Sequence, residues 1–283
     1  MSRHLRSVAA IFCLSGSAVM AHAQPGQAEF AARRSALATR IGEGALIAFG
    51  GRTPVTDFGP FYQLSSFHYV TGFDEPDAAF VMVVHGGKPV STLYLSPIDP
   101  RTAFYYGRRP DSASVSRDLG VEARSFGALA AVADSLASSG TSIYTLADFS
   151  DADFARQDSL TRGRMFVRSL VASHPNLVTH DAHPFVDELR ARKSDAEIAL
   201  LRRAAEISSE GHRAVLMLPR PSHEYEMQSA LEGTFLRLGG ARPAYGSIVG
   251  SGRNGTQLHY MRDRGPAMPG DLVVIDAATE YEG

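Results

Sequence analysis

The sequence predicts an α/β domain followed by an α+β region, and two changes of pattern along the chain carry that prediction. Up to about residue 183, short apolar runs of strand length alternate with segments of helical periodicity. After Pro184 the pattern changes to long helices, and then to two short strands joined by a glycine-rich connection. With 283 residues and 44% hydrophobic content, the chain has the size of two modest domains.

Residues 1–23 have the composition of a secretory signal peptide. Arg3 and Arg6 give a basic start, residues 8–20 are mainly apolar, and Ala21-His22-Ala23 is a small-x-small cleavage signal. The apolar run is shorter than the roughly 20 residues that span a bilayer. We therefore expect a secreted or periplasmic protein with no membrane span after cleavage.

The composition of the expected mature chain excludes several kinds of chemistry. Cys13, the one cysteine, lies in the signal peptide, so disulfides, thiol nucleophiles and cysteine-ligated zinc are excluded. Without Arg3 and Arg6, 26 basic residues face 30 acidic ones, a formal net charge of −4. Such a balance is a poor basis for nucleic-acid binding, and no nucleic-acid partner is expected.

Residues 24–183 are predicted to form the α/β domain. Its expected elements are strands at 45–49, 78–84, 93–95 and 143–146, and helices at 129–136 and 154–171.

Residues 184–283 are predicted to form a second domain that opens with helices. Two helical pieces within 185–218 meet at Lys193-Ser194, where Ser194 and Glu197 fit the S-x-x-E capping box. Ser222 is the expected cap of the next helix, which stops at Gly239-Gly240. Apolar strands are expected at 245–249 and 272–275. The helix after Ser222 carries one apolar face, made by Met227, Leu231, Phe235 and Leu238.

The glycine-rich segment 250–255 fits G-x-G-x-x-G, the fingerprint of dinucleotide-binding domains. It follows a predicted strand, and an acidic residue lies about 20 residues further on. The fingerprint needs a crossover helix, however, and only residues 256–264 are available before Gly265 and Pro266. A glycine-rich turn is the favoured interpretation, and dinucleotide binding stays open as an alternative.

Asp276 and His259 are the candidate site residues. Asp276 follows a strand that is expected to be buried, and a carboxylate at the end of a rigid buried strand is a common way to hold a metal, although an Asp in that place is more often a turn former or cap. A lone histidine such as His259 is more often a surface or core residue than a catalytic one. The residues alone leave both readings open.

Several longer motifs together resemble the Xaa-Pro aminopeptidases, or aminopeptidase P, of the creatinase and methionine-aminopeptidase-like superfamily. The likeness covers nearly the whole mature chain. The motifs are the segments 67–76, 106–109, 193–207, 248–252, 258–260 and 270–277.

The resemblance implies a creatinase-like N-terminal α/β domain followed by the first, incomplete part of an α+β pita-bread catalytic domain. It implies two divalent metal ions, manganese, as cofactors, with Asp276 as the first metal ligand. It also implies that His259 is the active-site histidine that contacts the substrate, a peptide with proline at its second position. Ala278 departs from the family pattern, which has glycine there.

By the same resemblance, four of the five metal ligands are expected beyond Gly283. We therefore expect the chain as written to be inactive alone and to bind no stable dinuclear centre. A prolidase-like Xaa-Pro dipeptidase and a non-catalytic pita-bread binding module stay open as alternatives. A homo-oligomer is an expectation from the resemblance.

Overall fold

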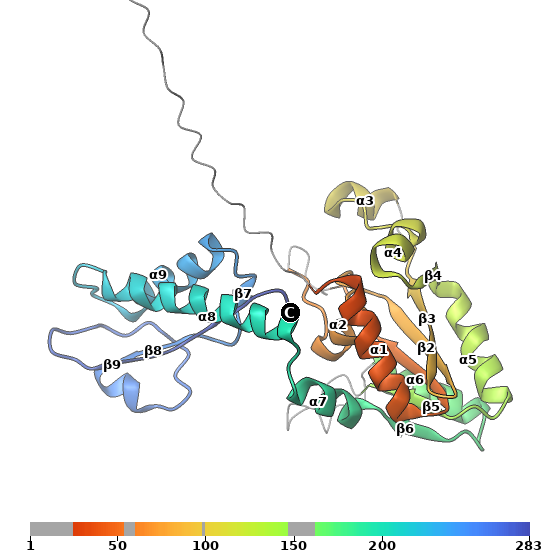
Figure 1. The fold of residues 1–283 in the computed structure, drawn as a ribbon. Coiled ribbons are helices and arrows are strands. Elements are labelled where there is room, and N and C mark those ends of the chain that lie inside the picture. The colour runs from red at the N-terminus through yellow and green to blue at the C-terminus, as the bar shows by residue number, and fades with distance from the viewer. Residues whose placement is uncertain (1–24, 54–59, 98–99, 147–161) are drawn as a thin grey trace, which may run out of the picture.

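The computed structural model describes residues 25–53, 60–97, 100–146 and 162–283, so the predicted signal peptide lies outside the described residues. It forms two bodies joined after helix α7, one built on a large sheet and one built on two long helices (Figure 1). The first body contains helices α1 (Gln27–Ile41), α2 (Ser65–Thr71), α3 (Pro100–Tyr106), α4 (Ser112–Leu119), α5 (Leu129–Ser138), α6 (Arg162–Ser173) and α7 (His183–Ala191), with the short 3-10 helix η1 (Phe126–Ala128).

A six-stranded mixed sheet forms the centre of the first body, in the order β4-β3-β2-β1-β5-β6. Strands β1, β2 and β3 pair antiparallel, whereas β4, β5 and β6 each join a neighbour in parallel. The turn between β2 and β3 is Gly86-Gly87, and both glycines have positive φ, as tight hairpin turns require. The strands are β1 (Gly44–Phe49), β2 (Ala79–His85), β3 (Lys88–Leu95), β4 (Glu122–Ser125), β5 (Ile143–Thr145) and β6 (Thr179–Asp181).

Both faces of this sheet are covered by helices, which is why β1 is apolar at every position. Leu46 and Ala48 face a core completed by α1, α2, α4 and α7, whereas Ala45, Ile47 and Phe49 face a core completed by α5 and α6. Every residue of β1 is buried. A strand buried on both faces reads as a continuous apolar run, and this run made the α/β prediction possible.

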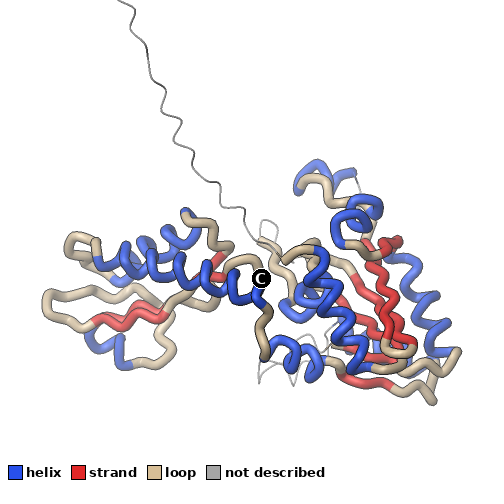
Figure 2. The backbone as a smooth tube through the Cα atoms, viewed as in Figure 1, coloured by secondary structure: helices blue, strands red, loops and turns tan. Residues whose placement is uncertain are grey.

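The second body packs helices α8 (Asp195–Leu216) and α9 (Glu224–Arg237) against each other and against two small sheets (Figure 2). Gly211 of α8 lets the helices approach, because a Cβ there would lie 2.3 Å from the Phe235 ring. Ile207, Leu231 and Phe235 are fully buried at the centre. The remaining elements are strands β7 (Arg242–Pro243), β8 (Ile248–Ser251), β9 (Val273–Asp276) and β10 (Thr279–Glu280), with the 3-10 helix η3 (Gly252–Thr256).

Most predicted elements are confirmed, with local differences. The Ser194/Glu197 capping box is present: the Glu197 amide donates to Ser194 Oγ at 3.2 Å, and the Ser194 amide donates to Glu197 Oε2 at 2.7 Å. The predicted cap at Ser222 is wrong, because His223 occupies the N-cap of α9. Ser222 instead donates from its hydroxyl to Glu226 at 2.7 Å.

Other predicted elements differ in extent, and the strand expected at 93–95 begins earlier, at Lys88. The strand expected at 245–249 runs at Ile248–Ser251, because Gly250 continues the pairing with β9. Of the helix expected at 154–171, residues 154–161 lie outside the described part, and α6 covers the rest.

The predicted domain division at residues 183/184 stays a prediction. In the structure, Ala182 and Val186 are buried in the first core, so α7 packs with the first body. The second core begins in α8. The chain passes from one core to the other between these helices, around Arg192 and Lys193.

Arg33 of α1 joins the two bodies at this crossing. Its guanidinium lies 3.2 Å from Glu29 of the same helix and 3.4 Å from Glu197 of α8, and it lies over the Tyr69 ring. Ser194 at the start of α8 donates to Glu29 at 2.7 Å. The Arg33 side chain is only 8% exposed, so the junction is a buried polar cluster.

Candidate functional site

The hairpin of β8 and β9 carries Asp276. The two strands pair antiparallel, with Asp276 opposite Ile248. Its side chain is exposed, and one carboxylate oxygen accepts a 2.5 Å hydrogen bond from the Tyr245 hydroxyl. This hydrogen bond, together with partial burial, raises the pKa of Tyr245, so the phenol remains a donor. Asp276 is thus an oriented carboxylate at the end of a strand, but that strand is largely exposed and not buried as predicted.

The glycine-rich segment between these strands does not form a nucleotide site. It continues into the 3-10 helix η3, and the strands on either side are antiparallel, whereas the dinucleotide fold needs parallel strands joined by an α-helix. The dinucleotide-binding alternative is therefore wrong. Gly250 serves packing, because a Cβ there would lie 2.9 Å from the backbone of Asn254 and Gly255.

His259 lies in the irregular segment after η3, and its side chain is exposed. Its neighbour Leu258 is 86% exposed, whereas Tyr260 on the other side is 7% exposed. Among the hydrogen bonds of the described residues, none joins His259 to Asp276. The two predicted site residues therefore lie on the same connected segment without a hydrogen bond between them, and their roles stay predictions.

Sequence reasoning missed Glu224, the best-connected buried acid of this region. The residue is fully buried at the start of α9. Burial raises its pKa, but the hydrogen bonds that it accepts outweigh burial, and its pKa lies below the ordinary value. The donors are Ser251 N at 2.8 Å, Asn254 Nδ2 at 2.8 Å, the Tyr260 hydroxyl at 2.8 Å and Gly265 N at 2.5 Å.

The sequence did contain a signal for Glu224, although a weak one. An acidic residue in the first turn of a helix is ordinarily explained by the helix dipole, and Glu226 offers the same explanation two residues later. Only the fold shows that Glu224 points into the second body, whereas Glu226 faces the Ser222 turn.

Asp263 is a second buried acid that fixes β8. It is 2% exposed and accepts a 2.9 Å hydrogen bond from the Val249 amide. Its φ of 48° is in the left-handed region, a conformation that Asp tolerates better than most residues. Burial raises the pKa of Asp263, and the nearby charge of Glu224 raises it further.

The donor set of the described residues does not fit a dinuclear metal centre. Within residues 25–53, 60–97, 100–146 and 162–283, no three His, Cys, Asp or Glu side chains gather as metal ligands do. Asp276 offers a single carboxylate, whereas two divalent ions need several ligands each.

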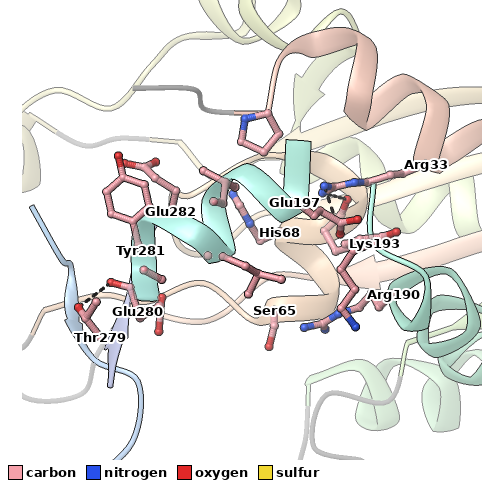
Figure 3. A pocket seen from close by; sticks show the side chains of 16 residues that line it. Arg33, Ser65, His68, Arg190, Lys193, Glu197, Thr279, Glu280, Tyr281 and Glu282 are labelled. Atoms are coloured by element: carbon pink, nitrogen blue, oxygen red, sulfur yellow. Dashed lines mark hydrogen bonds and ion pairs between the residues drawn. The ribbon is translucent and has the colours of Figure 1, made fainter. Parts of the chain in front are cut away.

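The cavity between the two bodies lies away from the candidate residues. A cavity of about 300 Å³ opens between the two bodies, beside the Arg33 cluster and residues 279–283 (Figure 3). Arg190 and Lys193 line one end, and Glu280 and Glu282 line the other. Neither His259 nor Asp276 lines this cavity.

In the part of the chain that the structure describes, no helix combines the length and the apolar character needed to cross a membrane.

Comparison with known proteins matches both bodies to one family. Residues 30–144 match the aminopeptidase P N-terminal domain, and residues 199–283 match metallopeptidase family M24. The Xaa-Pro aminopeptidase of Escherichia coli K12 is 32% identical over 263 residues, which cover 90% of this chain and 59% of that protein. The Xaa-Pro aminopeptidase of Haemophilus influenzae is also 32% identical, over 78% of this chain and 49% of its own length.

Solved structures agree with these matches. Zn-substituted E. coli aminopeptidase P in complex with product has a TM-score of 0.78 at 31% identity, over 92% of this chain and 60% of that one. A putative aminopeptidase P from Bacillus anthracis, at 23% identity, shares the fold with a TM-score of 0.82 over 91% of this chain and 62% of that one.

The chain thus spans about half to three fifths of the length of the curated relatives named above. The matches confirm the resemblance drawn from the sequence motifs and the predicted fold class, and membership of a metallopeptidase family implies a divalent metal cofactor. The chain belongs to metallopeptidase family M24, among its aminopeptidase P members.

Proposed function

We propose that this chain is the part of an Xaa-Pro aminopeptidase that carries the N-terminal domain and the first metal ligand. The observation that carries the proposal is Asp276, an exposed and oriented carboxylate at the end of β9, within the segment that matches the metallopeptidase family. The substrate would be a peptide with proline at its second position, as the names of the relatives imply.

In this proposal Asp276 would be one ligand of two divalent metal ions, manganese. When bound, such ions lower the pKa of a water molecule and polarise the scissile carbonyl. His259 would contact the substrate and stabilise the charge that develops on that carbonyl. The 283 residues supply one carboxylate of this set, so we propose that the chain alone is inactive.

The test has two parts, metal content and hydrolysis. Elemental analysis of the dialysed 283-residue chain is expected to find less than one manganese ion per chain. Incubation with an Xaa-Pro tripeptide and an Xaa-Pro dipeptide, followed by mass spectrometry, is expected to show no cleavage. Two tightly held ions with release of the first residue would contradict the inactivity of the chain, and cleavage of the dipeptide alone would favour a prolidase-like activity.

A non-catalytic binding module is a second candidate, favoured by the lack of a three-residue metal cluster among the described residues. The two candidate functions differ in whether they require the Asp276 carboxylate. A metallopeptidase needs that carboxylate for metal binding when the other ligands are supplied, whereas a binding module does not.

The export and assembly of the protein also stay proposals. The segment 1–23 is proposed to be cleaved during secretion to the periplasm or the medium, so N-terminal sequencing of the exported protein should begin at Gln24. A homo-oligomer is proposed from the resemblance alone, and sedimentation velocity would test it.

A further inference from the structure

The Glu224 carboxylate accepts hydrogen bonds from four residues of the segment that carries His259. Ser251 lies at the end of β8, Asn254 lies in η3, and Tyr260 and Gly265 lie in the irregular stretch before β9. The Glu224 amide also donates to the Gly265 carbonyl at 3.0 Å, so the two residues exchange hydrogen bonds in both directions. One buried carboxylate thus ties together both ends of a fifteen-residue stretch, 251–265.

Tyr260 is the link from Glu224 to His259. Its ring is buried, and its hydroxyl donates to Glu224 Oε2 at 2.8 Å while it accepts from Asn254 Nδ2 at 3.0 Å. His259 and Leu258 before it are exposed. The nearest buried side chain that can fix the backbone of His259 is therefore Tyr260, its direct neighbour.

We propose that Glu224 is a positioning residue for His259, acting through the Tyr260 hydroxyl. The inference rests on the proposed role of His259 as the residue that contacts the substrate. Glu224 itself is fully buried and does not reach the surface. Glu224 orients the His259 imidazole by fixing Tyr260, the residue that follows His259.

The chemistry of the four donors requires a carboxylate at this position. Each oxygen accepts two hydrogen bonds: Oε1 from Ser251 and Asn254, and Oε2 from Tyr260 and Gly265. Two of the donors are backbone N–H groups, which cannot reorient as a side-chain donor can. Glutamine has the same shape but one NH₂ group, and that group would face either the Ser251 or the Gly265 amide, donor against donor.

The test follows the surroundings of the His259 ring, in the isotope-labelled 283-residue chain, by two-dimensional NMR of the imidazole carbons and protons. His259→Asn identifies the His259 signal by its loss. Glu224→Gln removes the acceptor, and Tyr260→Phe removes only the hydroxyl that links the two residues. Glu226→Gln is the matched control, because it lies in the same helical turn and accepts from Ser222.

We expect Glu224→Gln and Tyr260→Phe each to shift the His259 signal further than Glu226→Gln does. If either variant shifts the His259 signal no further than Glu226→Gln does, the proposal is overturned. A loss of thermal stability without that larger shift would show that Glu224 has a purely structural role. Should Glu224→Gln fail to fold, Tyr260→Phe decides the question, because it deletes one oxygen atom and leaves three bonds to Glu224. No step depends on peptidase activity, so a failure of the proposed function would appear separately, in the hydrolysis assay.

Discussion

Replacing Arg33 with methionine is expected to loosen the junction between the two bodies. Arg33 is the cation between two carboxylates, Glu29 at 3.2 Å and Glu197 at 3.4 Å, and its guanidinium lies 4.2 Å from the Tyr69 ring centre. Methionine keeps the length and apolar stem of the side chain, so the variant removes the charge and its hydrogen bonds without opening a large cavity.

The magnitude follows from the burial of the group. Removing one partner of a fully buried ion pair costs about 3–5 kcal/mol, because the other charge is left uncompensated. Glu29 and Glu197 remain 23% and 17% exposed, and both keep a donor from Ser194. The free energy of opening the junction is therefore expected to fall by less, about 2 kcal/mol, which corresponds to roughly a thirtyfold larger open population.

Tryptic cleavage after Arg192 and Lys193 is the assay, because these exposed residues connect α7 to α8 and this short segment must unfold locally to enter the protease. The cleavage rate follows the open population when closing is faster than cutting. Arg213→Met is the control, since Arg213 is 73% exposed and pairs with Glu210 on the same helix at 3.5 Å. A surface pair of this kind contributes about 0–1 kcal/mol. If Arg33→Met speeds cleavage no more than the control does, the junction does not depend on this cluster.

Three further substitutions test the packing and electrostatics of the second body and the junction. Asp263→Asn is expected to gain stability over the wild type as pH rises from 4 to 7. The raised pKa of Asp263 means that ionising this buried carboxyl costs folding free energy, and the wild type loses that stability as pH rises through the folded-state pKa. Urea unfolding at several pH values measures the difference in unfolding free energy between the two proteins, and a pH-independent difference would refute the sign. Gly211→Ala is expected to lose about 1–3 kcal/mol by overpacking against Phe235, and a melting temperature equal to that of the wild type would contradict this contact. Ser194→Ala is expected to lose about 1–2 kcal/mol by removing the cap of α8, measured by the same unfolding assay, and Ser209→Ala on the exposed side of that helix should lose less.

Local chemistry made much of the fold predictable. Strand β1 is a continuous apolar run because helices cover both its faces. The start of α8 is marked in the sequence by the capping box of Ser194 and Glu197. The short polar strands were missed: β4 and β6 expose most of their side chains and are held by backbone pairing to β3 and β5. No apolar pattern marks such edge strands in a sequence.

Of the two candidate residues, Asp276 stands at the end of a recognisable element, whereas His259 lies in an irregular segment and was predicted from the family resemblance. Asp276 follows an apolar strand, and that position was visible in the sequence. The strand itself is largely exposed, with Val273 and Val274 at 38% and 47%, which an apolar run alone would not suggest. The sequence could not distinguish Glu224 from Glu226, because the donors of Glu224 come from residues 27 to 41 positions away and meet only in the folded chain.

The most direct test of the account is a fusion of residues 25–283 to the part of the E. coli relative that follows its matched region. Under the proposed function that part supplies the remaining metal ligands, so the fusion should bind divalent metal and release the first residue of an Xaa-Pro peptide. Asp276→Asn should abolish both metal binding and release, whereas Asp271→Asn, which changes another exposed carboxylate of the same hairpin, should keep both. A fusion that keeps its metal content and its peptidase activity without the Asp276 carboxylate would contradict the assignment of Asp276 as a metal ligand.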